Sequence, residues 1–130
     1  MPFFRMMSDN MKKTIMLKKN YEFRKIFSIG KHYYGKHIEV YISNNKEKIN
    51  KIGIAISKRV ANSVQRHKIR RLIKENYRII ESDVKSGINI LFMWKKDVDI
   101  KEANFYIIQN DIISIFDKSG VIEKNERNNY

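Results

Sequence analysis

The densest group of chemically useful side chains lies in residues 58–78. This segment holds eight Lys and Arg residues and a single acidic residue, Glu75. Guanidinium groups donate paired hydrogen bonds to phosphate oxygens, and Lys adds a compact positive charge. The chemistry that this segment predicts is binding of the phosphate groups of a polyanion.

The basic residues of this segment repeat with the period of an α-helix. At about 100° per residue, one stripe and its flanks contain Arg66, His67, Arg70, Arg71, Lys74 and Arg78. The opposite side of the same helix carries Ile69, Leu72, Ile73, Tyr77 and Ile80. Like charges four residues apart destabilise a helix. Stacked cations with so little acidic compensation therefore favour a phosphate-binding face over an ordinary solvated one.

Charge is distributed unevenly along the chain. The 130 residues include 27 Lys and Arg against 14 Asp and Glu, a net charge of +13. Residues 1–78 hold 20 basic and 5 acidic side chains, whereas residues 79–130 hold 7 and 9. A basic surface can serve solubility alone, but this segregation favours a polyanionic partner for the first part of the chain.

Composition limits the class of protein. The length suits one domain, and a hydrophobic fraction of 42% predicts that it folds. The chain has no Cys, which excludes disulfides and thiol chemistry and fits a reducing compartment. The apolar stretch that ends at Leu17 is too short for a secretory signal, and no run reaches the ~20 residues of a membrane span. We therefore expect a cytoplasmic protein.

Six elements are predicted to position the basic segment. Hydrophobic periodicity indicates helices over 20–27, 64–81 and 105–116, and strands over 37–43, 52–57 and 88–94. Asn20 is the expected N-cap of the first helix, Asn62 and Ser63 precede the second, and Gly30 and Gly120 are the expected stops. The order α-β-β-α-β-α predicts an α+β sandwich of a small sheet with helices.

The strands are expected to differ in their surroundings. The first two, separated by a polar turn, are predicted to pair as a hairpin, and the near-continuous apolar run at 88–94 predicts a central strand. In the strand over 52–57, Gly53, Ala55 and Ser57 share one face and are too small to fill a core layer. That face is expected to stay open and shallow.

We expect a disordered tail over 1–14, a single polyanion-binding domain over 15–122 and a frayed tail over 123–130. The first ten residues show no periodicity and contain the single Pro, and the residues after Ile122 are polar. No internal repeat or linker divides the domain.

The basic helix carries a recognisable motif. The string Gly53-x-x-x-Ser57-Lys58-Arg59-x-x-Asn62-x-Val64-x-Arg66-His67-Lys68-x-Arg70-Arg71-Leu72-Ile73-Lys74 resembles the signature of the bacterial ribonuclease P protein component. The resemblance extends over about residues 15–118. It implies a small α/β sandwich with a left-handed β-α-β crossover around the basic helix.

The resemblance also implies a function. In this family a ribonuclease P RNA with bound Mg²⁺ hydrolyses precursor tRNA, removes its 5′ leader and leaves a 5′ phosphate on the mature end. The protein is the accessory subunit, with no cofactor of its own, and it binds the leader and the RNA subunit. The implied activity is therefore that of an endoribonuclease whose bond cleavage is carried out by RNA.

Site residues follow from the motif. The resemblance implies RNA contacts for the basic helix and the pair before it: Lys58, Arg59, Arg66, His67, Lys68, Arg70, Arg71 and Lys74. It implies a cleft for the single-stranded leader lined by Phe23, Phe27 and Tyr41. This chain departs from the family where the usual Arg-Asn-Arg reads Arg66-His67-Lys68.

The aromatic residues have a second interpretation. Spacing alone favours the core for Phe23 and Phe27, and leaves Tyr41 undecided because it shares a strand face with Glu39. The basic-aromatic loop at Tyr33, Tyr34 and Lys36 is a further candidate for RNA contact.

Two other functions compete with the one that the resemblance implies. A nuclease acting alone would need clustered carboxylates or paired His residues, but the acids of residues 1–78 are widely spaced. A noncatalytic RNA-binding module, of ribosomal or chaperone type, would share the basic helix without needing the three aromatic residues.

Overall fold

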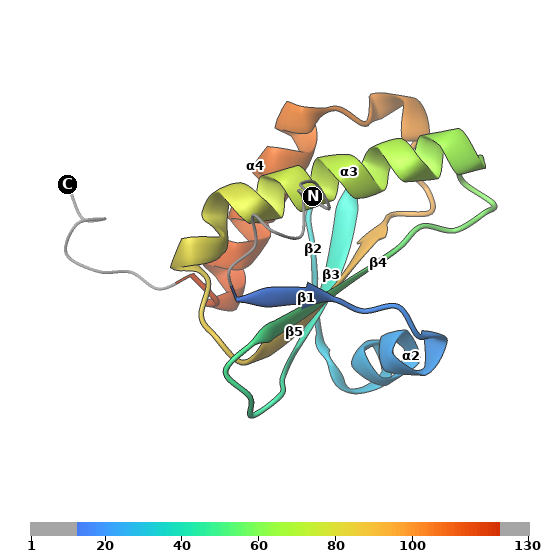
Figure 1. Cartoon of the computed structure of the whole chain (residues 1–130). Coiled ribbons are helices and arrows are strands. Elements are labelled where there is room, and N and C mark those ends of the chain that lie inside the picture. The colour runs from blue at the N-terminus through green and yellow to red at the C-terminus, as the bar shows by residue number, and fades with distance from the viewer. Residues whose placement is uncertain (1–12, 123–130) are drawn as a thin grey trace, which may run out of the picture.

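The computed structural model describes residues 13–122, which form a five-stranded sheet with helices on both faces (Figure 1). The strands are β1 (Thr14–Met16), β2 (Lys31–Tyr34), β3 (Ile38–Asn44), β4 (Asn50–Ala55) and β5 (Ile88–Trp94). The helices are α2 (Asn20–Ile29), α3 (Ser63–Ile80) and α4 (Phe105–Ser119), with short 3-10 turns η1 (Glu81–Asp83) and η2 (Ile100–Glu102). Figure 1 shows α3 and α4 together on one face and α2 on the other.

The predicted tails lie outside the described residues, except at one boundary. Thr14 belongs to β1 and is buried, so the ordered chain begins before residue 15.

The strand order is β1-β4-β5-β3-β2, and it corrects the predicted hairpin. β3 pairs antiparallel with β5, and β4 pairs parallel with β5 from its other side. The physical reason is burial: Ile90, Leu91 and Phe92 of β5 are each at most 2% exposed, so β5 needs a strand on both sides. The prediction of a central strand at 88–94 is confirmed.

The sheet also contains two edge strands, β1 and β2, that were not predicted from the sequence. Each has at most four residues, and β2, with the sequence KHYY, shows no alternation of apolar and polar side chains. β2 lies where a basic-aromatic loop was expected, and pairs antiparallel with β3. Short edge strands carry little burial, so their sequences give a weak strand signal.

α3 connects the parallel strands β4 and β5, which gives the β-α-β unit that the family resemblance implied. Its left-handed sense stays a prediction. The apolar side of α3 is buried as predicted, with Ile69, Ile73 and Tyr77 at most 1% exposed. The long helix therefore turns its cations outward.

The core has two parts. The larger fills the space between the sheet and the α3–α4 layer, and includes Ile38, Val40, Ile52, Ile54, Phe92, Trp94, Ile108 and Phe116. The smaller lies beneath α2 and consists of Leu17, Ile26 and Leu91, with Phe23 and Tyr41 packed against it. The face of β4 that was expected to stay open is thus partly covered by α2.

Of the three helix ends predicted from the sequence, two are confirmed and one is wrong. Asn62 caps α3 by accepting a hydrogen bond from the Gln65 N–H at 2.8 Å, and the Gln65 side chain accepts one from the Asn62 N–H at 2.9 Å. Gly30 follows α2, and Gly120, with φ of 75°, ends α4. Asn20 is the first residue of α2 and Lys19 is its N-cap, so that prediction is wrong.

A buried polar group fastens β1 to the domain. The Tyr77 hydroxyl lies 2.7 Å from Thr14 Oγ1 and accepts a hydrogen bond from Asn50 Nδ2 at 3.3 Å. Asn50 Oδ1 in turn accepts from the Ile88 N–H at 3.1 Å. Burial raises the pKa of Tyr77, partly offset by the hydrogen bonds from Thr14 and Asn50. These bonds fix the edge of the sheet that borders the basic helix.

Candidate nucleic-acid interface

The cationic side of α3 borders a cavity of about 580 Å³, hereafter the cationic cavity. Four of its lining residues come from α3: His67, Arg70, Arg71 and Lys74. The others come from β1, α2, β4 and the stretch between β1 and α2: Met16, Leu17, Lys18, Asn20, Phe23 and Ile54. The cavity therefore brings one predicted cleft residue, Phe23, together with half of the predicted basic residues.

The cations of this cavity are not used in the fold. Within residues 13–122, the cations Lys18, Arg70, Arg71 and Lys74 form no ion pair or side-chain hydrogen bond, and the His67 ring beside them forms none either. Their charges lie side by side without carboxylates to neutralise them, which costs stability unless an anion binds. The arrangement is suited to the phosphates of a nucleic acid.

The remaining predicted basic residues lie elsewhere on and before α3. Arg66 is half-buried, and its Nη1 donates a hydrogen bond to the Ala61 carbonyl at 2.9 Å. Part of its guanidinium therefore holds the loop before the helix. Lys58, Arg59 and Lys68 do not line the cationic cavity, and Arg59 and Lys68 are exposed.

The three predicted aromatic residues lie together beneath and beside α2. The rings of Phe27 and Tyr41 have centroids 4.8 Å apart, and Phe27 is 52% exposed. Phe23 is half-buried over Gly53, where an added Cβ would lie 2.9 Å from the Phe23 ring. Phe23 thus serves both the small core and the cavity wall, whereas Phe27 offers an open face.

The surroundings of Tyr41 extend further than the sequence suggested. Burial, and then the carboxylate of Glu39, raise the pKa of Tyr41. The His32 ring stacks on Tyr41 with centroids 4.5 Å apart and an interplanar angle of 17°. Sequence reasoning misses His32 as a site residue because β2 has the composition of a loop. The pairing of His32 with Tyr41 and of Tyr34 with Glu39 is set by the strand register, so the local sequence carried no signal for it.

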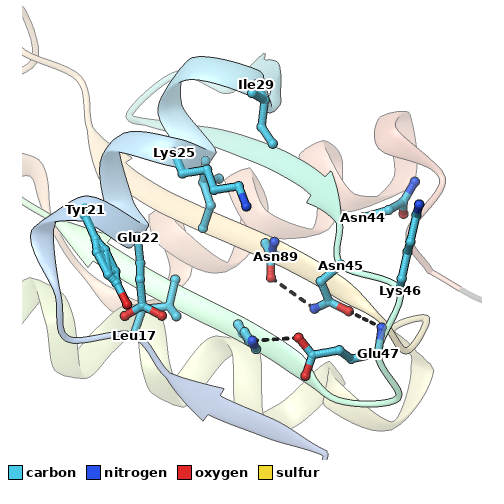
Figure 2. Close-up of a pocket in the computed structure, with 12 residues that line it drawn as sticks. Leu17, Tyr21, Glu22, Lys25, Ile29, Asn44, Asn45, Lys46, Glu47 and Asn89 are labelled. Carbon is cyan, nitrogen blue, oxygen red and sulfur yellow. Dashed lines mark hydrogen bonds and ion pairs between the residues drawn. The ribbon is translucent and has the colours of Figure 1, made fainter.

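A second cavity, of about 560 Å³, lies by α2 and the loop between β3 and β4, and we call it the amide pocket (Figure 2). Asn45 donates to Asn89 Oδ1 at 3.0 Å and to the Ile49 carbonyl at 3.1 Å, and accepts from the Glu47 N–H at 2.8 Å. These amides satisfy one another and hold the loop.

Neither a metal site nor a membrane span is found in the described part of the chain. Residues 13–122 contain no group of three or more His, Cys, Asp or Glu side chains placed to hold a metal ion. Over the same residues, no helix has the length and apolar character needed to cross a bilayer.

An α+β domain with an unpaired cationic helix face beside a half-buried aromatic ring has the features of the class of RNA-binding proteins. The family model described as Ribonuclease P matches residues 11–120. The chain therefore belongs to the Ribonuclease P family, the protein component of the ribonucleoprotein that cleaves tRNA precursors.

Individual relatives agree with this assignment. The chain is 32% identical over 115 residues to the ribonuclease P protein component of Natranaerobius thermophilus, covering 88% of this chain and 98% of that protein. The same component of Clostridioides difficile is 36% identical over 110 residues, covering 84% and 95%. Both similarities extend over most of the chain.

Solved structures match the fold as well. The Staphylococcus aureus RNase P protein aligns with a TM-score of 0.73 at 28% identity, covering 83% of this chain and 97% of that one. The Thermotoga maritima protein aligns with a TM-score of 0.71 at 18% identity, covering 80% and 96%, which supports the fold alone.

Proposed function

We propose that this chain binds the 5′ leader of precursor tRNA and the ribonuclease P RNA, and so assists Mg²⁺-dependent removal of the leader. The observation that carries the proposal is the cationic cavity, in which Phe23 shares a wall with the unpaired cations of α3. Aromatic rings bind bases of any sequence by stacking, and the cations bind the phosphates between them. Both are needed to hold a single strand of varied sequence.

The protein side chains divide into two groups in this proposal. Phe23 and Phe27 take unstacked leader bases, and Tyr41 lines the cleft behind the Phe27 ring. His67, Arg70, Arg71 and Lys74 take leader phosphates. Arg66, Lys58, Arg59 and Lys68 lie outside the cavity wall. We assign these four to the RNA subunit, since a second polyanion must be held at the same time.

The chemical step belongs to the RNA in this proposal. Mg²⁺ held by the RNA subunit would activate a water for attack on the phosphodiester. The bond to the 3′ oxygen of the last leader nucleotide would break, that oxygen would take up a proton, and the 5′ phosphate would stay on the mature tRNA. The protein orients the leader and lowers the repulsion between two RNA backbones. Its contribution is therefore greatest where Mg²⁺ is scarce.

The deciding experiment is cleavage of a precursor tRNA at limiting Mg²⁺ by the protein alone, by a bacterial ribonuclease P RNA alone, and by both. We expect only the mixture to cut efficiently at the mature 5′ end. A protein that binds RNA but leaves cleavage unchanged would instead be a noncatalytic RNA-binding module.

A variant pair makes the assay specific. Arg70→Ala with Arg71→Ala removes two cations of the cavity, and should raise the Mg²⁺ concentration needed for half-maximal cleavage. Lys101→Ala with Lys118→Ala removes the same charge from exposed residues of η2 and α4. This control should behave like the parent, and an equal effect of both pairs would reduce the role of the cavity to net charge.

A further inference from the structure

A row of four rings crosses from α2 to the far edge of the sheet. It runs from Phe27 on α2 to Tyr41 on β3, then to His32 and Tyr34 on β2. The centroids are 4.8 Å apart from Phe27 to Tyr41, 4.5 Å from Tyr41 to His32, and 5.7 Å from His32 to Tyr34. The first two rings belong to the proposed leader cleft, and the last two have no role assigned so far.

The strand register places the whole row on one face. His32 is opposite Tyr41 and Tyr34 is opposite Glu39 in the antiparallel pair of β2 and β3. Side chains of opposite residues point to the same side of a sheet. The row therefore continues the α2 face out to β2, the last strand in the order β1-β4-β5-β3-β2.

Of the two inner rings of the row, Tyr41 is covered, whereas the His32 side chain is 40% exposed and both end rings are open. Tyr41 lies between Phe27 and His32, and is half-buried. Phe27 is 52% exposed and Tyr34 is 62% exposed. New bases would therefore stack on the end rings, while Tyr41 supports them from within.

A cation is placed beside the far end of the row. Lys95 Nζ lies 5.4 Å from the centroid of the Tyr34 ring. Its hydrogen bond to the Gly35 carbonyl is long, at 3.4 Å, and can give way to a phosphate oxygen. An aromatic face with an adjacent cation has the composition of a single-stranded RNA site.

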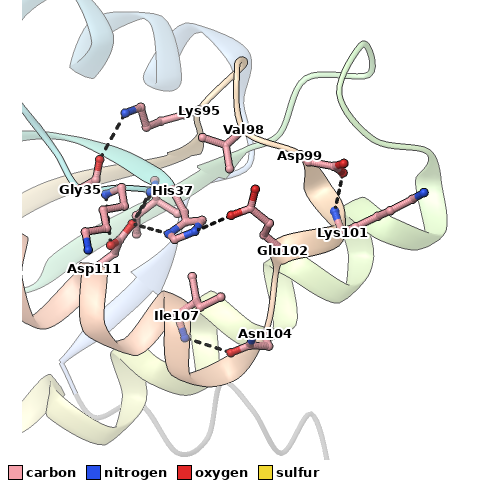
Figure 3. Close-up of polar contacts among 12 residues, drawn as sticks. Gly35, His37, Lys95, Val98, Asp99, Lys101, Glu102, Asn104, Ile107 and Asp111 are labelled. Carbon is pink, nitrogen blue, oxygen red and sulfur yellow. Dashed lines mark hydrogen bonds and ion pairs between the residues drawn. The ribbon is translucent and has the colours of Figure 1, made fainter.

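The turn that follows Tyr34 is held firmly from behind (Figure 3). The buried carboxylate of Asp111 on α4 accepts hydrogen bonds from the N–H groups of Lys36, His37 and Ile38, at 3.2, 2.6 and 2.9 Å. In addition, the His32 ring is fixed by an Nε2 contact of 2.8 Å to Glu39. A preformed platform binds a ligand with less loss of entropy than a mobile one.

We propose that His32, Tyr34 and Lys95 form a second binding site for the single-stranded leader, beyond the cleft of Phe23, Phe27 and Tyr41. Tyr34 stacks on a leader base, Lys95 contacts the neighbouring phosphate, and His32 is a positioning residue that joins the two sites. The inference rests on the proposed function, because it assumes that the strand in the cleft is the leader.

The position of the site predicts which nucleotides it takes. The cationic cavity lies by β1 and β4, and Tyr34 lies at the opposite edge, on β2. Strands spaced by about 4.8 Å make this path about 19 Å long, or several nucleotides. With the cleavage point placed on the side of the cationic cavity, as the inference requires, the second site would bind leader nucleotides further from that point, and only long leaders would reach it.

The test compares Tyr34→Ala, Tyr34→Phe and Tyr106→Ala. Tyr34→Phe keeps the stacking ring. Tyr106 is 71% exposed on α4, which packs on the other face of the sheet, so its substitution is the matched control. Holoenzyme affinity is measured for precursor tRNAs whose leaders run from one to about twelve nucleotides.

We expect Tyr34→Ala to weaken binding of long leaders by about 5-fold to 100-fold and to leave the shortest leaders unchanged. Tyr34→Phe and Tyr106→Ala should match the parent at every length. Equal affinity of Tyr34→Ala and the parent at all lengths, or an equal loss at all lengths, would overturn the second site.

A separate measurement distinguishes this failure from that of the proposed function. The full chain without RNA subunit is titrated with fluorescent single-stranded RNA of the same lengths. If the parent holoenzyme ignores the leader, the proposed function fails. Loss of long-oligonucleotide binding in Tyr34→Ala would then still support the RNA site, and unchanged binding would overturn it.

Discussion

Two cavities of nearly equal volume border α2, and they differ in how many of their polar side chains are paired. In the amide pocket, Asn45 and Asn89 bond to each other, and Lys51 pairs with Glu47 at 2.8 Å. In the cationic cavity, the basic side chains of α3 have no such partners among residues 13–122. Polar groups that are hydrogen-bonded to one another stabilise a fold, whereas unpaired positive charges at a surface are free to bind an anion. The two cavities therefore differ in whether their polar side chains are paired within the fold, although their volumes are nearly the same.

The largest expected effect is on the cationic cavity. Arg70→Ala with Arg71→Ala should weaken binding of single-stranded RNA about tenfold or more. The slope of log Kd against log salt should fall by about 0.7 for each phosphate that the variant no longer neutralises. Fluorescence titrations at several salt concentrations measure both quantities. A parallel shift of the two salt lines would mean that neither Arg binds phosphate.

The second prediction concerns Gly53, which lies under the Phe23 ring. A Cβ at this position would lie 2.9 Å from Phe23 Cε1, so Gly53→Ala should displace the ring and lower the free energy of unfolding by about 1–2 kcal/mol. Adding Phe23→Leu should restore stability in urea unfolding but not RNA affinity. Recovery of both would show that the Phe23 ring is needed only for packing.

In the amide pocket, we expect a substitution to lower stability without changing RNA affinity. Asn45→Ala leaves Asn89 Oδ1 and the Glu47 N–H without their partner, and should destabilise the domain by about 1 kcal/mol. RNA affinity, measured on the same preparation, should match that of the parent. A loss of RNA affinity without a loss of stability would show that the amide pocket binds RNA, and the proposed difference between the two cavities would then be wrong.

The smallest effect is expected at Tyr77, which fastens the β1 edge near the cationic cavity. Tyr77→Phe should cost about 1 kcal/mol at neutral pH, since Thr14 and Asn50 lose their partner. The folded-state pKa of Tyr77 is raised, so the phenol ionises first in the unfolded chain. The stability difference between parent and variant should therefore narrow as pH rises above about 10. A difference that stays constant to higher pH would contradict the raised pKa.

The cationic residues that α3 contributes to the cavity could be predicted from the sequence, but most of the residues that face them could not. Helical periodicity separates the buried Ile69 and Tyr77 from the exposed Arg70, because one long amphipathic helix has a strong signal. The wall opposite α3 depends on β1, whose three residues carry no such pattern. The cavity could therefore be predicted on its α3 side and, through the family resemblance, at Phe23, but not along the rest of the opposite wall.

The order in which the strands pair could not be predicted from the sequence for a related reason. A polar turn between 37–43 and 52–57 favours a hairpin locally, but burial of β5 on both faces decides the order of the sheet. The stacking of His32 on Tyr41 depends on the register of β2 against β3, which local sequence does not determine. Residues that depend on long-range pairing are thus the ones that sequence reasoning misses.

The central place of β5 has a consequence for synthesis of the chain. β3 and β4 do not pair with each other, because β5, which begins at Ile88, lies between them and pairs with both. β1 likewise finds Tyr77 only after α3 has been made. A nascent chain that stops short of Ile88 has no sheet to close, so the domain folds late, after most of it has left the ribosome. Until then its basic segments emerge without the structure that later separates their charged and apolar sides.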